Sequence, residues 1–162
     1  MKDKRGSTVD RKKWLKSVSI FSDLDDNELT RISERCNEKS FDADEIIFVE
    51  HTEGDEMYLI IEGEVSIQLE LANEEDVMPL ITLKGGDIFG ELSVVDESPR
   101  SATARSRTDT RLLVLSKKDF DNLMESDHEL GYKVMNKIAK LVSRRVRHAN
   151  QKILDNVSWG ML

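Results

Sequence analysis

The sequence predicts a mainly β protein of the α+β class: an antiparallel β-roll, of the double-stranded jelly-roll kind, flanked by N-terminal helices and a long C-terminal helix. Two observations support this. Between residues 41 and 115, apolar residues alternate with polar ones or form short runs at even spacing, separated by turn residues, which is typical of roughly eight short strands. After residue 116 the apolar residues recur in steps of three and four, which predicts helices.

Composition and charge narrow the class of protein. Of the 162 residues, 38% are hydrophobic and 35% charged, as in a folded globular domain. The net charge of −8 argues against binding nucleic acid through a broad basic surface. No apolar run is long enough to span a membrane, no apolar leader follows the basic start, and Cys36 is the single cysteine. We therefore expect a cytoplasmic protein, with no membrane insertion and no direct nucleic-acid binding by this chain.

The N-terminal segment, residues 1–19, is predicted to be a polar arm followed by a short amphipathic helix from Trp14 onward. A second helix start is expected at Asp25, because an aspartate three residues before Glu28 matches a capping box. Cys36 then falls on the apolar face of that pattern, and we interpret it as a small buried hydrophobe rather than a reactive thiol.

The β-roll is expected to cover residues 20–127, with turn residues between its strands. Strands are predicted at residues 46–49, 57–61, 65–71, 79–83, 102–107 and 111–115. Serine or aspartate residues then mark two helix starts, near Ser116 and near Ser126.

Within the roll, the segment 86–103 has the composition of a site for a phosphate and a sugar. Gly90 permits a tight turn, and the residues after it can open a short helix whose free N–H groups attract an anion. Arg100 offers a planar fork of donors that suits two phosphate oxygens. Glu91, an acceptor when ionised, suits a sugar hydroxyl.

At these residues the sequence resembles the cyclic nucleotide-binding domain family, whose phosphate-binding cassette is a Phe-Gly-Glu-Leu run followed by Pro-Arg-Ser-Ala. The resemblance implies that Glu91 takes the ribose 2′-hydroxyl, that Arg100 and Ser101 hold the cyclic phosphate, and that the ligand is cAMP or cGMP. Ser101 favours cAMP slightly, because cGMP-preferring relatives often carry threonine there. The ligand-binding residues implied are Phe89, Gly90, Glu91, Leu92, Ser93, Arg100, Ser101 and Ala102.

The resemblance extends from about Ile20 to the C-terminal helix, with two departures. The family usually has glycine where His51 stands and often proline where Glu53 stands, so the turn between those strands is expected to differ in shape. The cassette itself is intact.

Residues 128–162 are predicted to form the long C-terminal helix and a tail. Its apolar stripe fits two arrangements, a contact with a second copy in a homodimer or packing on its own roll. The resemblance implies that this helix also covers the purine base, with Leu141, Arg144 and Arg145 as candidates for the base lid. In the tail, Trp159 and Met161 are candidates for a pocket cap, an interface or a frayed end. Bacterial regulators of this family carry a DNA-binding helix-turn-helix after the helix, so the chain is either a stand-alone sensor or a fragment.

No catalytic or metal site is expected. The roll class includes metal enzymes, but only His51, His128 and His148 are present, and two of them fall in the helical C-terminal part. We see no nucleophile–histidine set and no phosphate loop of the Walker type, so we predict neither an enzyme nor a cofactor beyond the nucleotide.

Two functions therefore remain open. The first is a module that senses a cyclic nucleotide, cAMP before cGMP, and transmits its occupancy through the C-terminal helix. The second is a ligand-free interaction module that docks an effector protein, with Glu91 and Arg100 paired to each other.

Overall fold

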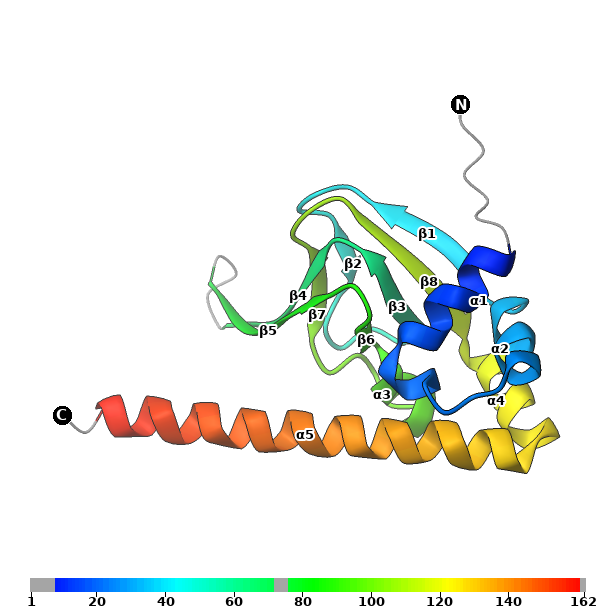
Figure 1. Cartoon of the computed structure of the whole chain (residues 1–162). Coiled ribbons are helices and arrows are strands. Elements are labelled where there is room, and N and C mark those ends of the chain that lie inside the picture. The colour runs from blue at the N-terminus through cyan, green and yellow to red at the C-terminus, as the bar shows by residue number, and fades with distance from the viewer. Residues whose placement is uncertain (1–7, 72–75, 161–162) are drawn as a thin grey trace.

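The computed structural model describes residues 8–71 and 76–160, with side chains described for residues 11–71 and 76–155. A β-roll lies above one long helix, α5, and a group of shorter helices packs at one end of the roll (Figure 1). None of the described helices is long and apolar enough to cross a membrane.

The described strands form two four-stranded sheets in which all neighbouring strands are antiparallel. In one sheet the order is β1 (Asn37–Phe41), β8 (Thr110–Ser116), β3 (Glu56–Glu62) and β6 (Ile88–Phe89). In the other it is β2 (Ile46–Phe48), β7 (Thr103–Ser106), β4 (Glu64–Glu70) and β5 (Val77–Lys84). The predicted fold class, a mainly β antiparallel roll with flanking helices, is confirmed.

The described helices are α1 (Thr8–Ser17), the 3-10 turn η1 (Ser19–Phe21), α2 (Asp26–Ser33), α3 (Glu91–Asp96), α4 (Lys117–Ser126) and α5 (His128–Gly160). Two of them, α2 and α4, begin directly after the capping residues that the sequence predicts. In the capping box of α2, the Glu28 amide donates to the Asp25 carboxylate and the Asp25 amide donates to the Glu28 carboxylate, each at 2.8 Å. Ser116 caps α4 by accepting from the Asp119 amide at 3.1 Å.

Three elements differ from the sequence prediction, and one of them is the two-residue strand β6, which was not predicted as a strand. Helix α1 begins at Thr8, so the expectation of an arm reaching Trp14 is wrong for the residues between them. Strand β1 was not predicted, because its residues are mostly polar and show no clean alternation. It forms because it pairs along its whole length with β8, from Asn37 opposite Val114 to Phe41 opposite Thr110.

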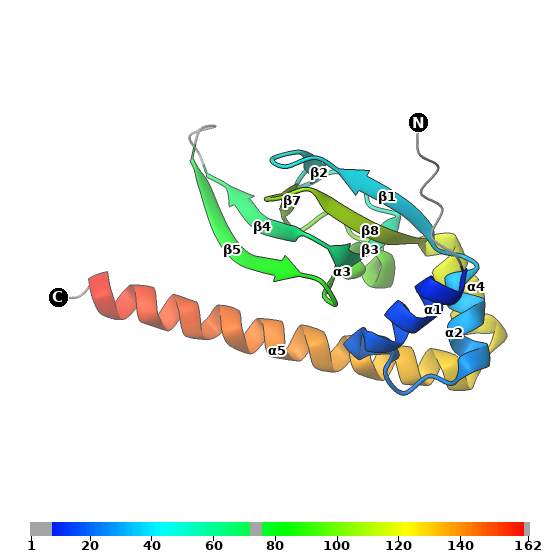
Figure 2. The ribbon, with the colours of Figure 1, turned by 45° about the horizontal axis from the view of Figure 1, so that its top comes forward.

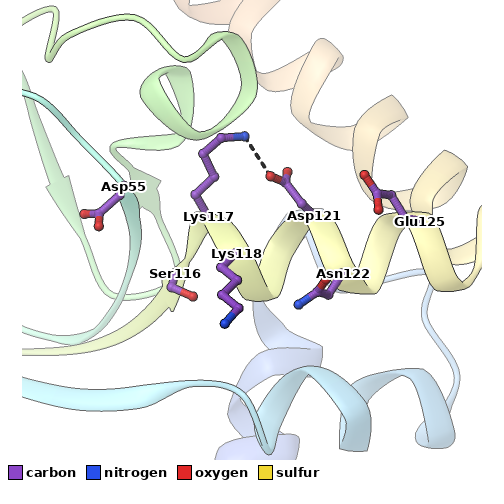
Figure 3. Close-up of a pocket in the computed structure, with 7 residues that line it drawn as sticks. All are labelled: Asp55, Ser116, Lys117, Lys118, Asp121, Asn122 and Glu125. Atoms are coloured by element: carbon purple, nitrogen blue, oxygen red, sulfur yellow. Dashed lines mark hydrogen bonds and ion pairs between the residues drawn. The ribbon is translucent and has the colours of Figure 1, made fainter.

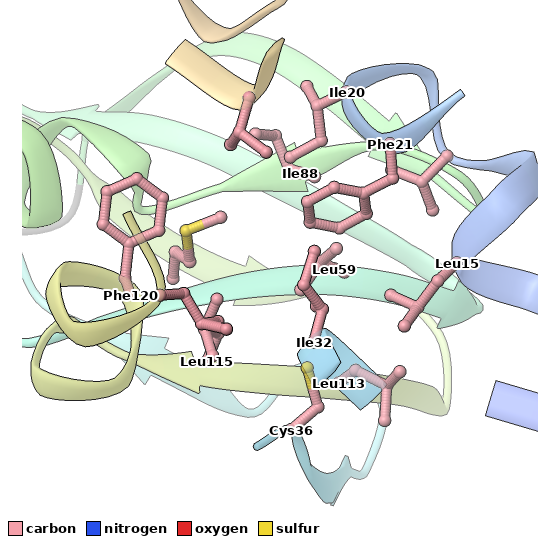
Figure 4. Close-up of a cluster of buried hydrophobic side chains, with 14 of the residues drawn as sticks. Leu15, Ile20, Phe21, Ile32, Cys36, Leu59, Ile88, Leu113, Leu115 and Phe120 are labelled. Carbon is pink, nitrogen blue, oxygen red and sulfur yellow. The ribbon is translucent and has the colours of Figure 1, made fainter. Parts of the chain in front are cut away.

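Two apolar cores lie on opposite faces of the sheet that contains β3. Successive side chains of a strand point to opposite faces, so Met57 and Leu59 enter one core while Tyr58 and Ile60 enter the other. The first core lies under the helices (Figure 4), and the second fills the space between the two sheets. The first half of α5 belongs to the first core, through Leu130, Val134 and Ile138.

Cys36 lies in the helical core with 2% of its surface exposed, as a buried hydrophobe should. Burial raises the pKa of its thiol to about 12, so almost no thiolate exists at pH 8. We expect the native protein to react very slowly with a disulfide reagent at pH 8, and to react at the rate of a free thiol in guanidinium chloride. Fast reaction of the native protein would show that the α2 end of this core opens readily.

Candidate functional site

A cavity of about 710 Å³ lies between the second half of α5, strands β4 and β5, and the segment that carries α3. Its volume is in the range of roughly 300–1,000 Å³ that is usual for small-molecule sites. One wall is apolar and includes Ile67 and Ile81, and the other carries Arg100 and Glu91. A site with an apolar wall and a few convergent polar groups is suited to a ligand that is apolar at one end and charged at the other.

Gly90 shapes the entrance to helix α3. It has φ of 73°, in the left-handed region that glycine adopts without strain, and it is the N-cap of α3. A Cβ at this position would lie 2.8 Å from Arg100 Nη1 and 3.1 Å from the Glu56 carbonyl oxygen. Both the backbone conformation and the close approach of Arg100 therefore require glycine here.

Arg100 is a buried cation without a carboxylate partner in the described part of the chain. Only 4% of it is exposed, and among the described residues no carboxylate oxygen lies within 4.0 Å of its guanidinium. Its Nη1 donates to the Gly90 carbonyl at 3.1 Å, its Cζ lies 4.2 Å from the centre of the Phe48 ring, and its Nε has no acceptor in the described part of the chain. Burial lowers the pKa of this guanidinium, because the charged form has lost solvent. An anion in the cavity would compensate that charge.

The backbone of Arg100 is fixed by the loop between β2 and β3. Its amide donates to the Thr52 carbonyl, and its carbonyl accepts from the His51 amide, both at 2.8 Å. His51 has φ of 66°, which explains why glycine suits this position in the resembling family. His51 is one of the described non-glycine residues with a positive φ.

Gly54, in the same loop, makes room for the Arg100 side chain. A Cβ at Gly54 would lie 2.3 Å from Nε and 2.5 Å from Cζ of Arg100. From the sequence, this loop is predicted only as a turn, because nothing local indicates that Gly54 meets a residue 46 positions later.

Glu91 is also buried, with 3% exposed, and its partner is on α5. Arg145 Nη1 lies 2.7 Å from Glu91 Oε1, and Arg145 Nη2 donates to the Ile88 carbonyl. The internal pair of Glu91 with Arg100, on which the interaction-module hypothesis depended, is not among the ion pairs of the described residues. Glu91 and Arg100 therefore do not pair with each other. Glu91 pairs instead with Arg145, and this ion pair links α5 to the cavity wall.

A second hollow lies between the start of α4 and the loop before β3 (Figure 3). It is lined by Asp55, Ser116, Lys117, Lys118, Asp121, Asn122 and Glu125. Lys117 donates to Asp121 at 2.8 Å and to the Val94 carbonyl of α3 at 3.3 Å, so its charge is already satisfied. This hollow contains none of the predicted binding residues, and the cavity beside Arg100 is the stronger candidate site.

Residues 38–127, more than half of the chain, match the family described as "Cyclic nucleotide-binding domain". The chain belongs to this family. A cAMP-dependent protein kinase regulatory subunit of Emericella nidulans is 32% identical over 111 residues, which cover 68% of this chain and 26% of that protein. The chain therefore spans about a quarter of that relative's length.

Solved structures of similar fold support the same assignment. A cyclic nucleotide-binding domain from Methylobacillus flagellatus gives a TM-score of 0.82 at 26% identity, over 93% of this chain and 86% of that one. The catabolite activator protein of Thermus thermophilus gives a TM-score of 0.73 at 28% identity, over 86% of this chain and 63% of that one. These relatives include a protein kinase regulatory subunit and a catabolite activator protein.

The structure brings all the predicted cassette residues of this cyclic nucleotide-binding domain to one cavity. Its lining includes Phe89, Gly90, Glu91, Leu92, Ser93, Arg100, Ser101 and Ala102. Of the three candidates for the base lid, Arg145 lines the cavity, whereas Leu141 packs against the helical core and Arg144 is exposed outside the cavity. Met161 and the side chain of Trp159 lie outside the described residues.

The part of α5 that follows Arg145 was not predicted to belong to the site. His148, Ala149, Lys152 and Ile153 also line the cavity. Their spacing of three, four, seven and eight residues from Arg145 marks one face of a helix, and this signal could have identified them once Arg145 was placed.

Proposed function

We propose that this domain binds a cyclic purine monophosphate, cAMP in preference to cGMP. The observation that supports this most strongly is the buried guanidinium of Arg100, which faces a cavity and has no carboxylate partner among the described residues. Hydrogen bonds between ionised groups are stronger than neutral ones, and the planar fork of arginine matches two oxygens of one phosphate.

The family resemblance and the presence of these residues in the cavity lining support roles for the others. Arg100 and Ser101 hold the cyclic phosphate, Glu91 accepts from the ribose 2′-hydroxyl, and the apolar wall that includes Ile67 and Ile81 receives the base. Relatives whose names include cAMP support this choice of ligand, among them the regulatory subunit of Emericella nidulans.

Helix α5 would transmit the occupancy of the cavity. Its first half is part of the helical core, through Val134 and Ile138, and its second half lines the cavity, through Arg145 and Ala149. A nucleotide then shifts the equilibrium between two positions of the helix. The size of the shift is the difference in its binding free energy for the two positions, typically about 1–3 kcal/mol. The domain is regulatory rather than catalytic, and its output goes to an effector protein or to a second copy that meets the exposed side of α5 near Val146.

Ligand titrations test the proposal directly. We expect calorimetry to detect cAMP binding, with weaker binding of cGMP and little or none of 5′-AMP, whose open phosphate has a different shape and charge. At a hundred times its dissociation constant, cAMP should add about 2.7 kcal/mol to the free energy of unfolding, measured as a rise in the thermal midpoint. If neither cyclic nucleotide gave heat or a thermal shift, the interaction-module function would be favoured instead.

A further inference from the structure

We propose that two aromatic side chains, Phe48 and Tyr58, position Arg100 for the phosphate: their ring faces hold the guanidinium by cation–π contact and leave its hydrogen-bond donors available to the ligand. This inference rests on the proposed function, because it takes Arg100 as the group that binds the cyclic phosphate. It adds two uncharged positioning residues to the site.

The attraction follows from the distances between the guanidinium and the two rings. Cζ of Arg100 lies over the Phe48 ring at 4.2 Å from its centre, and over the Tyr58 ring at 5.7 Å from its centre. Both distances are within the range of about 6 Å in which the face of an aromatic ring attracts a cation. Since only 4% of Arg100 is exposed, water screens this attraction little, and the rings compensate part of the cost of burying the charge.

An aromatic face holds the guanidinium in a way that a carboxylate could not. The N–H donors of arginine lie in the plane of the group, and a carboxylate partner would occupy the same donors that a phosphate needs. Among the described residues, Nη1 donates to the Gly90 carbonyl at 3.1 Å and Nε has no acceptor. The rings contact the face of the group instead, so its other donors stay available to the phosphate oxygens.

The two rings are themselves held in a cluster with Phe89, the residue before Gly90. Tyr58 and Phe89 are stacked, with ring centres 5.0 Å apart and planes at 14°, and Phe48 lies 5.7 Å from the first and 5.9 Å from the second. Phe48 is on β2 and Tyr58 on β3, so the cluster joins the two sheets. Figure 2 shows α3, which begins at Glu91, beside β3. The cluster therefore fixes the rings relative to the cassette.

The Tyr58 ring is anchored at its hydroxyl by a carboxylate. The hydroxyl donates to Glu56 at 2.8 Å, and both oxygens of Glu56 accept from Lys39 of β1 at 2.8 Å. Burial and the neighbouring Glu56 raise the pKa of Tyr58 above its ordinary value, so the hydroxyl stays a donor. Donation to a carboxylate increases the electron density of the ring, which strengthens its attraction for the Arg100 guanidinium.

The first test uses nucleotide-free protein and asks whether Phe48 keeps the guanidinium rigid. The mobility of the Arg100 Nε–Hε group is measured as a heteronuclear NOE by NMR on protein that contains isotope-labelled arginine, and the signal is assigned by its loss in Arg100→Ala. We expect the high NOE of a rigid group in the unmodified protein and in Phe48→Tyr, which keeps an aromatic face. We expect the low NOE of a mobile side chain in Phe48→Leu.

Phe41→Leu is the matched control for this measurement. Phe41 packs against the same core between the sheets but does not line the cavity, so its loss should leave the Arg100 NOE unchanged. Phe48→Met is measured beside Phe48→Leu, so that one folded variant is enough for the comparison. An unchanged NOE in a folded variant without the Phe48 ring, or an equal drop in Phe41→Leu, would overturn the positioning role, whatever the protein binds.

The second test adds cAMP and is read by calorimetry. Phe48→Leu should raise the dissociation constant for cAMP by about tenfold, and Phe48→Tyr should restore most of the affinity. Because Phe48 also lines the cavity, a double-mutant cycle must separate its effect on Arg100 from a direct contact with the ligand. If Phe48 acts through Arg100, Phe48→Leu should change the affinity of Arg100→Ala little further.

The outcomes of the two tests are distinguishable. Equal cAMP affinity of Phe48→Leu and the unmodified protein would overturn the inference, and so would effects of Phe48→Leu and Arg100→Ala that simply add. Failure of every protein to bind cAMP would instead overturn the proposed function, while the NOE would still decide whether the rings hold the guanidinium.

Discussion

Replacing Arg100 with alanine should raise the dissociation constant for cAMP by at least about thirtyfold. Truncating one partner of a buried, hydrogen-bonded charge pair costs roughly 2–5 kcal/mol, and about 1.4 kcal/mol corresponds to a factor of ten. The cyclic phosphate would enter the cavity without its counter-charge. Isothermal titration calorimetry would measure the change. The thermal midpoint of the nucleotide-free protein should change little, because the substitution also removes a desolvated charge that has no carboxylate partner among the described residues.

Two further variants separate charge from geometry. Arg100→Lys keeps a positive charge but loses the planar fork, so its affinity should lie between those of the unmodified protein and Arg100→Ala. Arg111→Ala is the matched control, because Arg111 pairs with Glu38 on the outside of the roll and does not line the cavity. Unchanged cAMP affinity in Arg100→Ala would refute the role assigned to this arginine.

A single methyl group at Gly54 should weaken cAMP binding by roughly ten- to a hundredfold while leaving stability nearly unchanged. The added Cβ would lie 2.3 Å from Arg100 Nε, so the guanidinium must move. Gly54 is not among the described glycines with positive φ, so alanine fits its backbone, and the atoms it meets belong to a flexible side chain. Hydrogen bonds to charged groups are worth about 1.5–3 kcal/mol each, and the displaced guanidinium would lose at least one of them to the phosphate.

A double-mutant cycle checks that Gly54 acts through Arg100. In the Arg100→Ala background, Gly54→Ala should have almost no further effect on cAMP affinity, because the side chain that it displaces is gone. If the two effects simply added, Gly54 would influence the ligand by another route. If Gly54→Ala strongly lowered the thermal midpoint, the loop itself rather than Arg100 would be the part that cannot accept the methyl group.

The elements that the sequence predicted well are those encoded by neighbouring residues. The capping residues Asp25 and Ser116 mark the starts of α2 and α4, because a cap needs only a side-chain oxygen and an amide three residues away. Strand β1 could not be predicted in the same way. Its residues do not alternate, and it exists because β8, some seventy residues later, offers it backbone partners.

The candidate site was likewise predictable where it depends on neighbouring residues and not where it depends on distant ones. The chain's own sequence determined the roll and the glycine before α3, since both depend on local pattern and spacing. It also determined which two charged residues, Glu91 and Arg100, lie on the cavity wall. Only the tertiary structure decided that Gly54 accommodates Arg100 and that Arg145, rather than Arg100, pairs with Glu91. The physical reason is that such contacts join side chains about fifty residues apart, and their distances are set by how the two sheets and α5 pack, which no short stretch of sequence contains.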